Sequence, residues 1–158
     1  MKSIVIYDSL YGNTERIAQA MGNALVEQGE VVVTRVGEAK IDQLVGADLL
    51  VVGSPTQQFR PTVGTKNLLN LIPKNGLKGI KVAAFDTRFP MPVIEKTPPL
   101  PFFVRIFGYA AGRIAKLLKA KGGELVVAPE GFFVEDTKGP LIEGELERAA
   151  SWAKKLFA

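Results

Sequence analysis

The sequence contains neither cysteine nor histidine. Disulfides, thiolate nucleophiles, imidazole bases and the usual zinc ligands are therefore excluded, and any redox chemistry has to come from a bound cofactor. A long hydrophobic run at the N-terminus is also lacking, because the short apolar stretch there ends at Asp8. This stretch is too short for a secretory signal, so we expect a cytoplasmic protein with no integral membrane segment. Because the usual zinc ligands are lacking, we also expect no metal site.

The composition is that of one globular domain. Of the 158 residues, 47% are hydrophobic and 23% are charged, which excludes disordered and membrane-spanning proteins. We expect a single domain over residues 1–158. The net charge is +4, but Lys and Arg are scattered and mostly interleaved with Glu and Asp. A mixed-charge surface is therefore favoured over a functional basic patch, and no nucleic-acid partner is expected.

Two kinds of apolar segment alternate along the chain. Continuous runs rich in Val, Ile and Leu are typical of strands covered on both faces, and they occur at residues 4–6, 31–36, 49–52, 82–85 and 125–127. Apolar residues at helical spacing lie between them, at residues 17–25, 68–72, 106–118 and 142–157, with a weak helical turn near 41–45. Gly122 and Gly123 are typical of a helix end before a strand.

This alternation predicts an α/β fold. Right-handed crossovers between successive strands produce a parallel sheet with helices on both faces. The ligand crevice of such a sheet lies outside the carboxyl ends of its strands, at the point where the strand order reverses. The loops after the first, third and fourth strands are therefore the candidate site.

The first of these loops has the composition of a phosphate site without a lysine. Hydroxyl groups from Ser9, Tyr11 and Thr14 are concentrated near Gly12 and Asn13, directly before a helix. Backbone N–H groups at a helix start carry a partial positive charge and can hold a phosphate. The loop matches neither GxxxxGK[ST] nor GxGxxG, which leaves a monophosphate. Side chains of these types also cap helices without binding a ligand, so both interpretations stay open at this point.

The segment SLYGNT resembles the Ser/Thr-x-Thr-Gly-x-Thr phosphate loop of flavodoxins, with Tyr11 in place of the middle Thr. The resemblance implies a short-chain, flavodoxin-like three-layer sandwich with a five-stranded parallel sheet in the order 2-1-3-4-5, binding one FMN. The FMN phosphate would then be held by the side chains and backbone amides of this loop, namely Ser9, Leu10, Tyr11, Gly12, Asn13 and Thr14.

The loop after the third strand is similar to the Ser-Pro-Thr loop that borders the flavin ring in this family. The resemblance implies that Pro55, Thr56, Gln57, Gln58 and Phe59 line the ring. Flavodoxins commonly have an aromatic residue directly after the Thr and then Gly or Asn. This chain has two glutamines there instead, so a change of backbone conformation in this loop would cost more than with glycine.

The fourth strand ends in Asp86, Thr87, Arg88 and Phe89, where the resemblance implies a further part of the cofactor site. Phe89 is the candidate for stacking on the ring, where flavodoxins usually have a Tyr; alternatively it packs under the proline-rich stretch at residues 90–101. An Arg88 guanidinium near the pyrimidine edge would favour the anionic reduced ring. We therefore expect a less negative potential for full reduction than in family members with acidic surroundings.

Three functions remain open on the sequence. The favoured one is a low-potential FMN electron carrier that works with a reductase and an acceptor, possibly through acidic surfaces of these partners, and has no catalytic residues of its own. The second is an FMN-dependent reductase that passes hydride from NAD(P)H to a quinone. The third is a binding module of the same fold without flavin. A phospho-receiver is set aside, because Gly53 and Ser54 stand where its acceptor aspartate would be.

Overall fold

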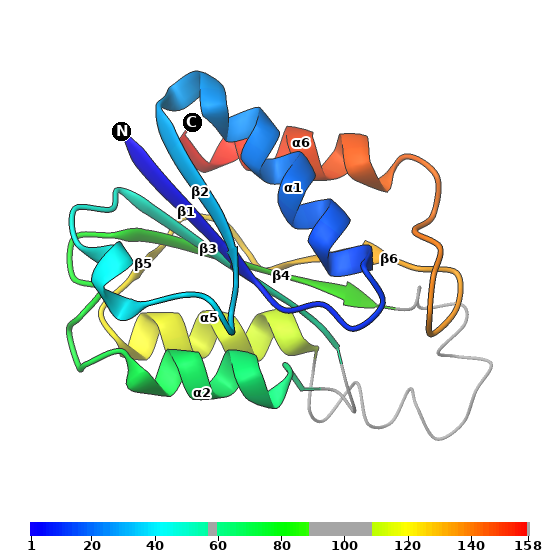
Figure 1. The fold of residues 1–158 in the computed structure, drawn as a ribbon. Helices are drawn as coiled ribbons and strands as arrows, with labels where there is room; N and C mark the ends of the chain where they lie inside the picture. Colours follow the sequence, from blue (N-terminus) through cyan, green and yellow to red (C-terminus); the bar gives the residue numbers. More distant parts are fainter. Residues whose placement is uncertain (57–59, 89–108, 158) are drawn as a thin grey trace.

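The computed structural model describes residues 1–56, 60–88 and 109–157, and it is a three-layer α/β sandwich (Figure 1). A central sheet separates α1 and α6 on one face from α2 and α5 on the other. The helices are α1 (Asn13–Leu25), α2 (Val63–Leu71), α5 (Ala110–Ala120) and α6 (Glu145–Lys154). Short 3-10 helices are η1 (Val26–Gln28), η2 (Ile41–Leu44) and η3 (Lys155–Phe157). None of the helices in the described ranges is long and apolar enough to cross a membrane.

The sheet is parallel, and its order is the predicted one. The strands are β1 (Lys2–Tyr7), β2 (Glu30–Arg35), β3 (Leu49–Pro55), β4 (Lys81–Arg88), β5 (Glu124–Leu125) and β6 (Glu130–Phe133). Their order is β2-β1-β3-β4-β5, with β6 also paired to β4. Val5 in β1 lies between Val33 of β2 and Val51 of β3. The predicted order 2-1-3-4-5 is confirmed, and the order reverses next to β1.

The expected fifth strand, residues 125–127, is the largest difference from the sequence prediction. It is divided into β5, which pairs with the start of β4, and β6, which pairs with its end. Val126 still donates to the Val82 carbonyl at 3.2 Å, but Pro129 has no N–H for the ladder and interrupts the strand. Because of this division, Phe132 lies beside Thr87 at the carboxyl end of β4.

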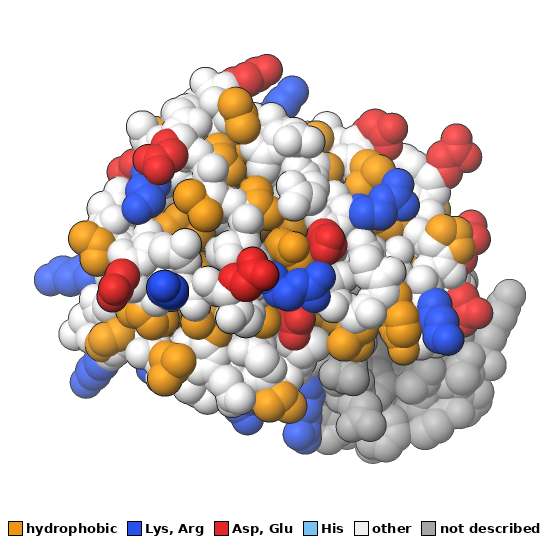
Figure 2. Space-filling view, in the orientation of Figure 1, with side chains coloured by type: hydrophobic (Ala, Val, Ile, Leu, Met, Phe, Trp, Pro, Cys, Tyr) orange, Lys and Arg blue, Asp and Glu red, His pale blue; other side chains and the backbone are white. Residues whose placement is uncertain are grey.

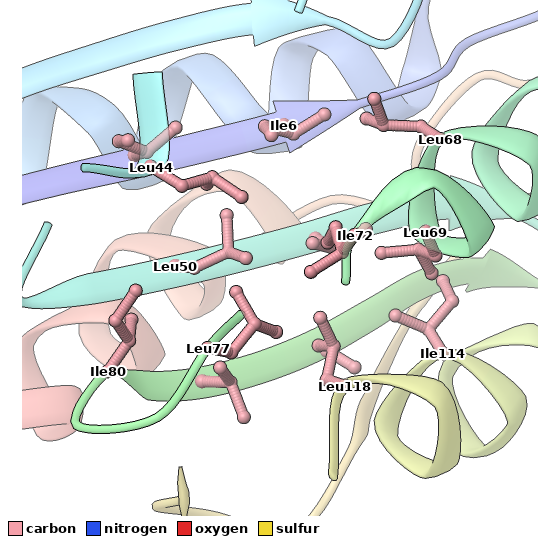
Figure 3. Close-up of a cluster of buried hydrophobic side chains, with 14 of the residues drawn as sticks. Ile6, Leu44, Leu50, Leu68, Leu69, Ile72, Leu77, Ile80, Ile114 and Leu118 are labelled. Atoms are coloured by element: carbon pink, nitrogen blue, oxygen red, sulfur yellow. The ribbon is translucent and has the colours of Figure 1, made fainter. Parts of the chain in front are cut away.

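Alternate residues of each strand face opposite helical layers. Leu50 and Val52 belong to the core under α2 and α5. Figure 3 shows Leu50 there with Leu69, Ile114 and other apolar side chains. Their neighbours Leu49 and Val51 belong to the core under α1 and α6. The apolar runs carry no polar alternation because both faces of each strand are covered.

An aromatic cluster fills the core under α6. Trp152 packs against Phe85 and Phe132 in edge-to-face geometry, with the three ring centroids 6.0 to 6.4 Å apart. Gly53 in β3 leaves room for this packing, since a Cβ there would overlap the Phe85 ring. The cluster joins the last helix to β4 and β6 directly below the strand ends that form the candidate site.

Glycines with positive φ set the starts and ends of several helices. α1 follows Gly12, with φ 92°, and α5 ends before Gly122, with φ 99°, as the Gly-Gly pair predicted. The last helix begins at Glu145 instead of near Ile142, because Gly144 at φ 90° turns the chain just before it. The predicted helical turn at residues 41–45 is η2.

Candidate functional site

The loop after β1 is shaped by the side chain of Ser9. Its Oγ accepts hydrogen bonds from the amides of Gly12, at 3.0 Å, and Glu15, at 3.4 Å. Its own amide donates to the Asp8 carboxylate at 2.9 Å. Ser9 thus takes the capping role at the start of α1 and folds the loop into a tight turn with Gly12 in the left-handed region.

Four backbone amides of this turn are left open. Within the described residues, the N–H groups of Leu10, Tyr11, Asn13 and Thr14 donate no hydrogen bond. They surround the start of α1, where the helix dipole adds a partial positive charge. The side chains of Leu10 and Tyr11 are exposed, while Thr14 is buried at 1% exposure. This set of unsatisfied donors fits a phosphate monoester.

Thr14 also connects this loop to the end of β4. Its hydroxyl lies 2.9 Å from the hydroxyl of Thr87, and both side chains are buried. Each hydroxyl has one proton to donate and two lone pairs, so the pair can still offer one proton to a third group. Two residues that the resemblance assigned to different parts of the cofactor therefore touch each other.

Arg35, at the end of β2, is a residue that the sequence reasoning missed. Its guanidinium donates to the Ser9 carbonyl and to the Glu15 carboxylate, both at 3.0 Å. It lies 3.9 Å from the Asp8 carboxylate. The strand order could have revealed it, since Arg35 is the register partner of Tyr7, one residue before the loop. Arg35 braces the outer side of the turn, but its charge is already used by carboxylates.

The end of β3 is held by hydrogen bonds to its neighbours. Thr56 donates its amide to the Thr87 carbonyl at 3.0 Å, and its Oγ1 accepts from the amide of Ala110, the first residue of α5, at 3.2 Å. Pro55 completes the strand. The other residues expected to line the ring, Gln57, Gln58, Phe59 and Phe89, lie outside the described residues.

At the end of β4, Asp86 and Arg88 satisfy each other. Arg88 donates through Nε and Nη2 to the two Asp86 oxygens, at 2.6 and 2.9 Å. Asp86 also accepts from the Ala111 amide at 2.9 Å and has no exposed surface. Burial raises the pKa of Asp86, while the Arg88 guanidinium and the Ala111 amide oppose that shift. The arrangement ties β4 to the start of α5.

Arg88 is therefore not an isolated cation. Its guanidinium carbon lies 3.7 Å from the centroid of the Tyr109 ring, and only 18% of its side chain is exposed. Because Asp86 offsets its charge, we expect a smaller effect on a nearby ring than a lone guanidinium would have. The expected influence of Arg88 on the reduction potential stays a prediction.

The segment from residue 134 to residue 144, between β6 and α6, also reaches the loop after β1. The Asn13 side-chain amide donates to the Lys138 carbonyl at 3.2 Å. The two residues that flank the segment are also joined, because Glu145 accepts a hydrogen bond from the Phe133 amide at 2.7 Å. Glu145 accepts a further hydrogen bond from Arg148. Burial acts to raise the pKa of Glu145, but these hydrogen bonds outweigh it and the pKa is lowered. Nothing local in the sequence predicted the contact between Asn13 and Lys138.

Comparison with known proteins defines the family. Residues 5–87 match the family model for flavodoxin. This match covers more than half of the chain, from β1 to the end of β4. The chain belongs to the flavodoxin family.

Solved structures show the same fold. Flavodoxin 1 from Bacillus cereus superposes with a TM-score of 0.77 at 17% identity, covering 99% of this chain and 97% of that one. A flavodoxin from the domain Archaea gives 0.72 at 23% identity over 100% of both chains. Rubredoxin oxygen:oxidoreductase from Desulfovibrio gigas gives 0.73 at 18% identity, with 98% of this chain matching 35% of that chain.

One curated protein is closer in sequence over a shorter stretch. The uncharacterized protein MJ0732 of Methanocaldococcus jannaschii is 34% identical over 70 residues. The match covers 40% of this chain and 18% of that protein's length. It indicates that a related segment occurs within a much longer protein.

Proposed function

We propose that the protein binds one FMN at the carboxyl edge of its sheet and carries electrons, in the cytoplasm, between a reductase and an acceptor. Membership of the flavodoxin family supports a flavin electron carrier. The observation that carries the choice of FMN is the set of open amides at Leu10, Tyr11, Asn13 and Thr14, which suits a monophosphate without a metal ion. When bound, FMN would supply the redox chemistry that a chain without cysteine or histidine lacks.

The residues proposed to hold FMN fall into two groups. The phosphate group would contact the turn from Ser9 to Thr14, with Gly12 giving the backbone its left-handed bend. The ring would lie toward Pro55 and Thr56 and the end of β4, at Asp86, Thr87 and Arg88. Because Asp86 and Arg88 are bound to each other and to Ala111, we propose that they fix the backbone there instead of donating to the ring.

The charge distribution supports a partner with an acidic surface. Between Leu49 and Gly123 the only acidic residues in the sequence are Asp86 and Glu95. The described part of this stretch has exposed cations on and beside α2 and α5, and Figure 2 shows several Lys and Arg side chains along the border where Figure 1 places α2. They are Arg60, Lys66, Lys74, Lys78, Lys81, Lys116 and Lys119. Positive potential over one face steers an acidic partner toward it.

Flavin titration followed by anaerobic reduction tests the proposal. Addition of FMN is expected to give a bound flavin absorption band, and reduction is expected to proceed in two one-electron stages. Direct two-electron reduction together with NAD(P)H oxidation would contradict the carrier and favour the reductase. Absence of binding at micromolar FMN would contradict the cofactor itself.

A further inference from the structure

The segment between β6 and α6 forms a short hairpin. Val134 and Leu141 make an antiparallel bridge, and the Glu135 amide donates to the Pro140 carbonyl at 2.9 Å. A turn closes the hairpin, with the Gly139 amide donating to the Asp136 carbonyl at 2.9 Å. Lys138 lies in this turn, so its main chain is held by the hairpin.

This turn is packed against the start of α1. The Asn13 side chain donates to the Lys138 carbonyl at 3.2 Å, across 125 positions of sequence. Gly139, with φ 103°, lies so close to the Asn13 side chain that a Cβ there would be 2.7 Å from Oδ1. The hydrogen bond and the close glycine contact together hold Lys138 beside the turn that carries the open amides.

The ammonium group of Lys138 is available there. Its Nζ lies 5.9 Å from the centroid of the exposed Tyr11 ring, within the range of a cation–π contact. It forms no ion pair with a carboxylate in the described ranges. Arg35, another cation beside the turn, is committed to Glu15 and to the Ser9 carbonyl.

We propose that Lys138 is a phosphate-binding residue, which supplies the positive charge missing from the Ser9–Thr14 turn and sets the preference for FMN over riboflavin. This inference rests on the proposed function. A phosphate monoester carries a charge between −1.5 and −2 near neutral pH, whereas a helix start offers about half a positive charge. The ammonium group of Lys138 offsets part of the difference, and Tyr11 keeps it near the turn.

The test compares two ligands that differ only in the phosphate. Dissociation constants for FMN and for riboflavin are measured by flavin fluorescence with the wild-type protein, with Lys138→Met and with Lys154→Met, a matched change of an exposed lysine on α6. Lys138→Met is expected to weaken FMN about five-fold and to leave riboflavin unchanged, since a partly exposed charge pair has an effect of this order. Lys154→Met is expected to change neither.

Two further measurements separate charge from packing. Lys138→Arg keeps the charge and is expected to retain most of the FMN affinity, and added salt should weaken FMN binding more in the wild type than in Lys138→Met. Equal weakening of FMN and riboflavin in Lys138→Met, or no change in either, would overturn the proposal. A wild-type protein that binds neither flavin would instead overturn the proposed function, so the two failures are distinguishable.

Discussion

The loop after β1 and the end of β4 lie at the same edge of the sheet but use their polar groups in opposite ways. The first leaves four amides without partners among the described residues. In the second, both oxygens of buried Asp86 accept from Arg88, and one also accepts from Ala111. The first region therefore has binding capacity to offer a ligand, whereas the second uses its capacity to hold the protein together.

The difference shows that polar residues at the right edge of a sheet need not have the same role. Unsatisfied donors at a helix start cost little while they face water, and they bind when an anion arrives. A buried carboxylate cannot be left unpaired, because its desolvation has to be offset inside the protein. Among the described residues, the hydrogen bond between the hydroxyl groups of Thr14 and Thr87 joins the two regions directly.

The largest effect is expected from replacing Arg88 with Met, which tests this contrast at the end of β4. It leaves the buried Asp86 carboxylate without its cation, and the free energy of unfolding is expected to fall by about 3 to 5 kcal/mol. Urea denaturation measures this loss. The ratio of FMN to riboflavin affinity is expected to stay unchanged, because the phosphate turn is untouched.

A double variant supplies the control for Arg88. Combining Arg88→Met with Asp86→Asn removes the unpaired charge, so it should be more stable than Arg88→Met alone. If the free energy of unfolding of Arg88→Met fell by less than about 1 kcal/mol, the pair of Asp86 and Arg88 would not stabilise the fold as expected.

Two single variants, Thr14→Val and Thr87→Val, sharpen the contrast. Each removes one hydroxyl of the same buried pair and leaves the remaining hydroxyl without its hydrogen-bond partner, so each is expected to lower the free energy of unfolding by about 1 to 3 kcal/mol. Only Thr14→Val should also reduce the preference for FMN over riboflavin, measured by flavin titration. An equal reduction in Thr87→Val would mean that the end of β4 also takes part in phosphate binding.

The smallest effect expected is a dependence of stability on acid, through Glu145. The pKa of Glu145 is lowered in the folded protein from 4.5, so its contribution is present above that value and is lost as the pH falls through the folded pKa. Urea denaturation at decreasing pH should show a shallower loss for Glu145→Gln than for the wild type. Glu147→Gln, which changes an exposed residue of the same helix, should follow the wild type.

The sequence predicted the elements that depend on local pattern. Apolar runs marked the strands, and the pair Gly122 and Gly123 marked a helix end, because both signals are contained in a few neighbouring residues. The division of the fifth strand follows from Pro129, which lies just after the predicted run at residues 125–127. The order 2-1-3-4-5 came from the family resemblance and not from the pattern itself.

The candidate site could be predicted only in part. The turn from Ser9 to Thr14 was recognised because its residues are consecutive. The contacts of Arg35 with Ser9 and of Lys138 with Asn13 join residues far apart in the chain, and no local periodicity encodes them. Arg88 was placed by analogy with the family, whereas its pairing depends on a carboxylate two positions earlier on the same face of β4.

The aromatic cluster under α6 gives the protein an internal optical probe. The chain has one tryptophan, and its ring packs against Phe85 of β4 and Phe132 of β6. Tryptophan fluorescence therefore reports whether α6 remains packed on the sheet. Far-ultraviolet circular dichroism reports the helices on both faces, which in the described residues are α1, α2, α5 and α6. Coincident transitions would therefore show that the two faces of the sandwich unfold as one cooperative unit.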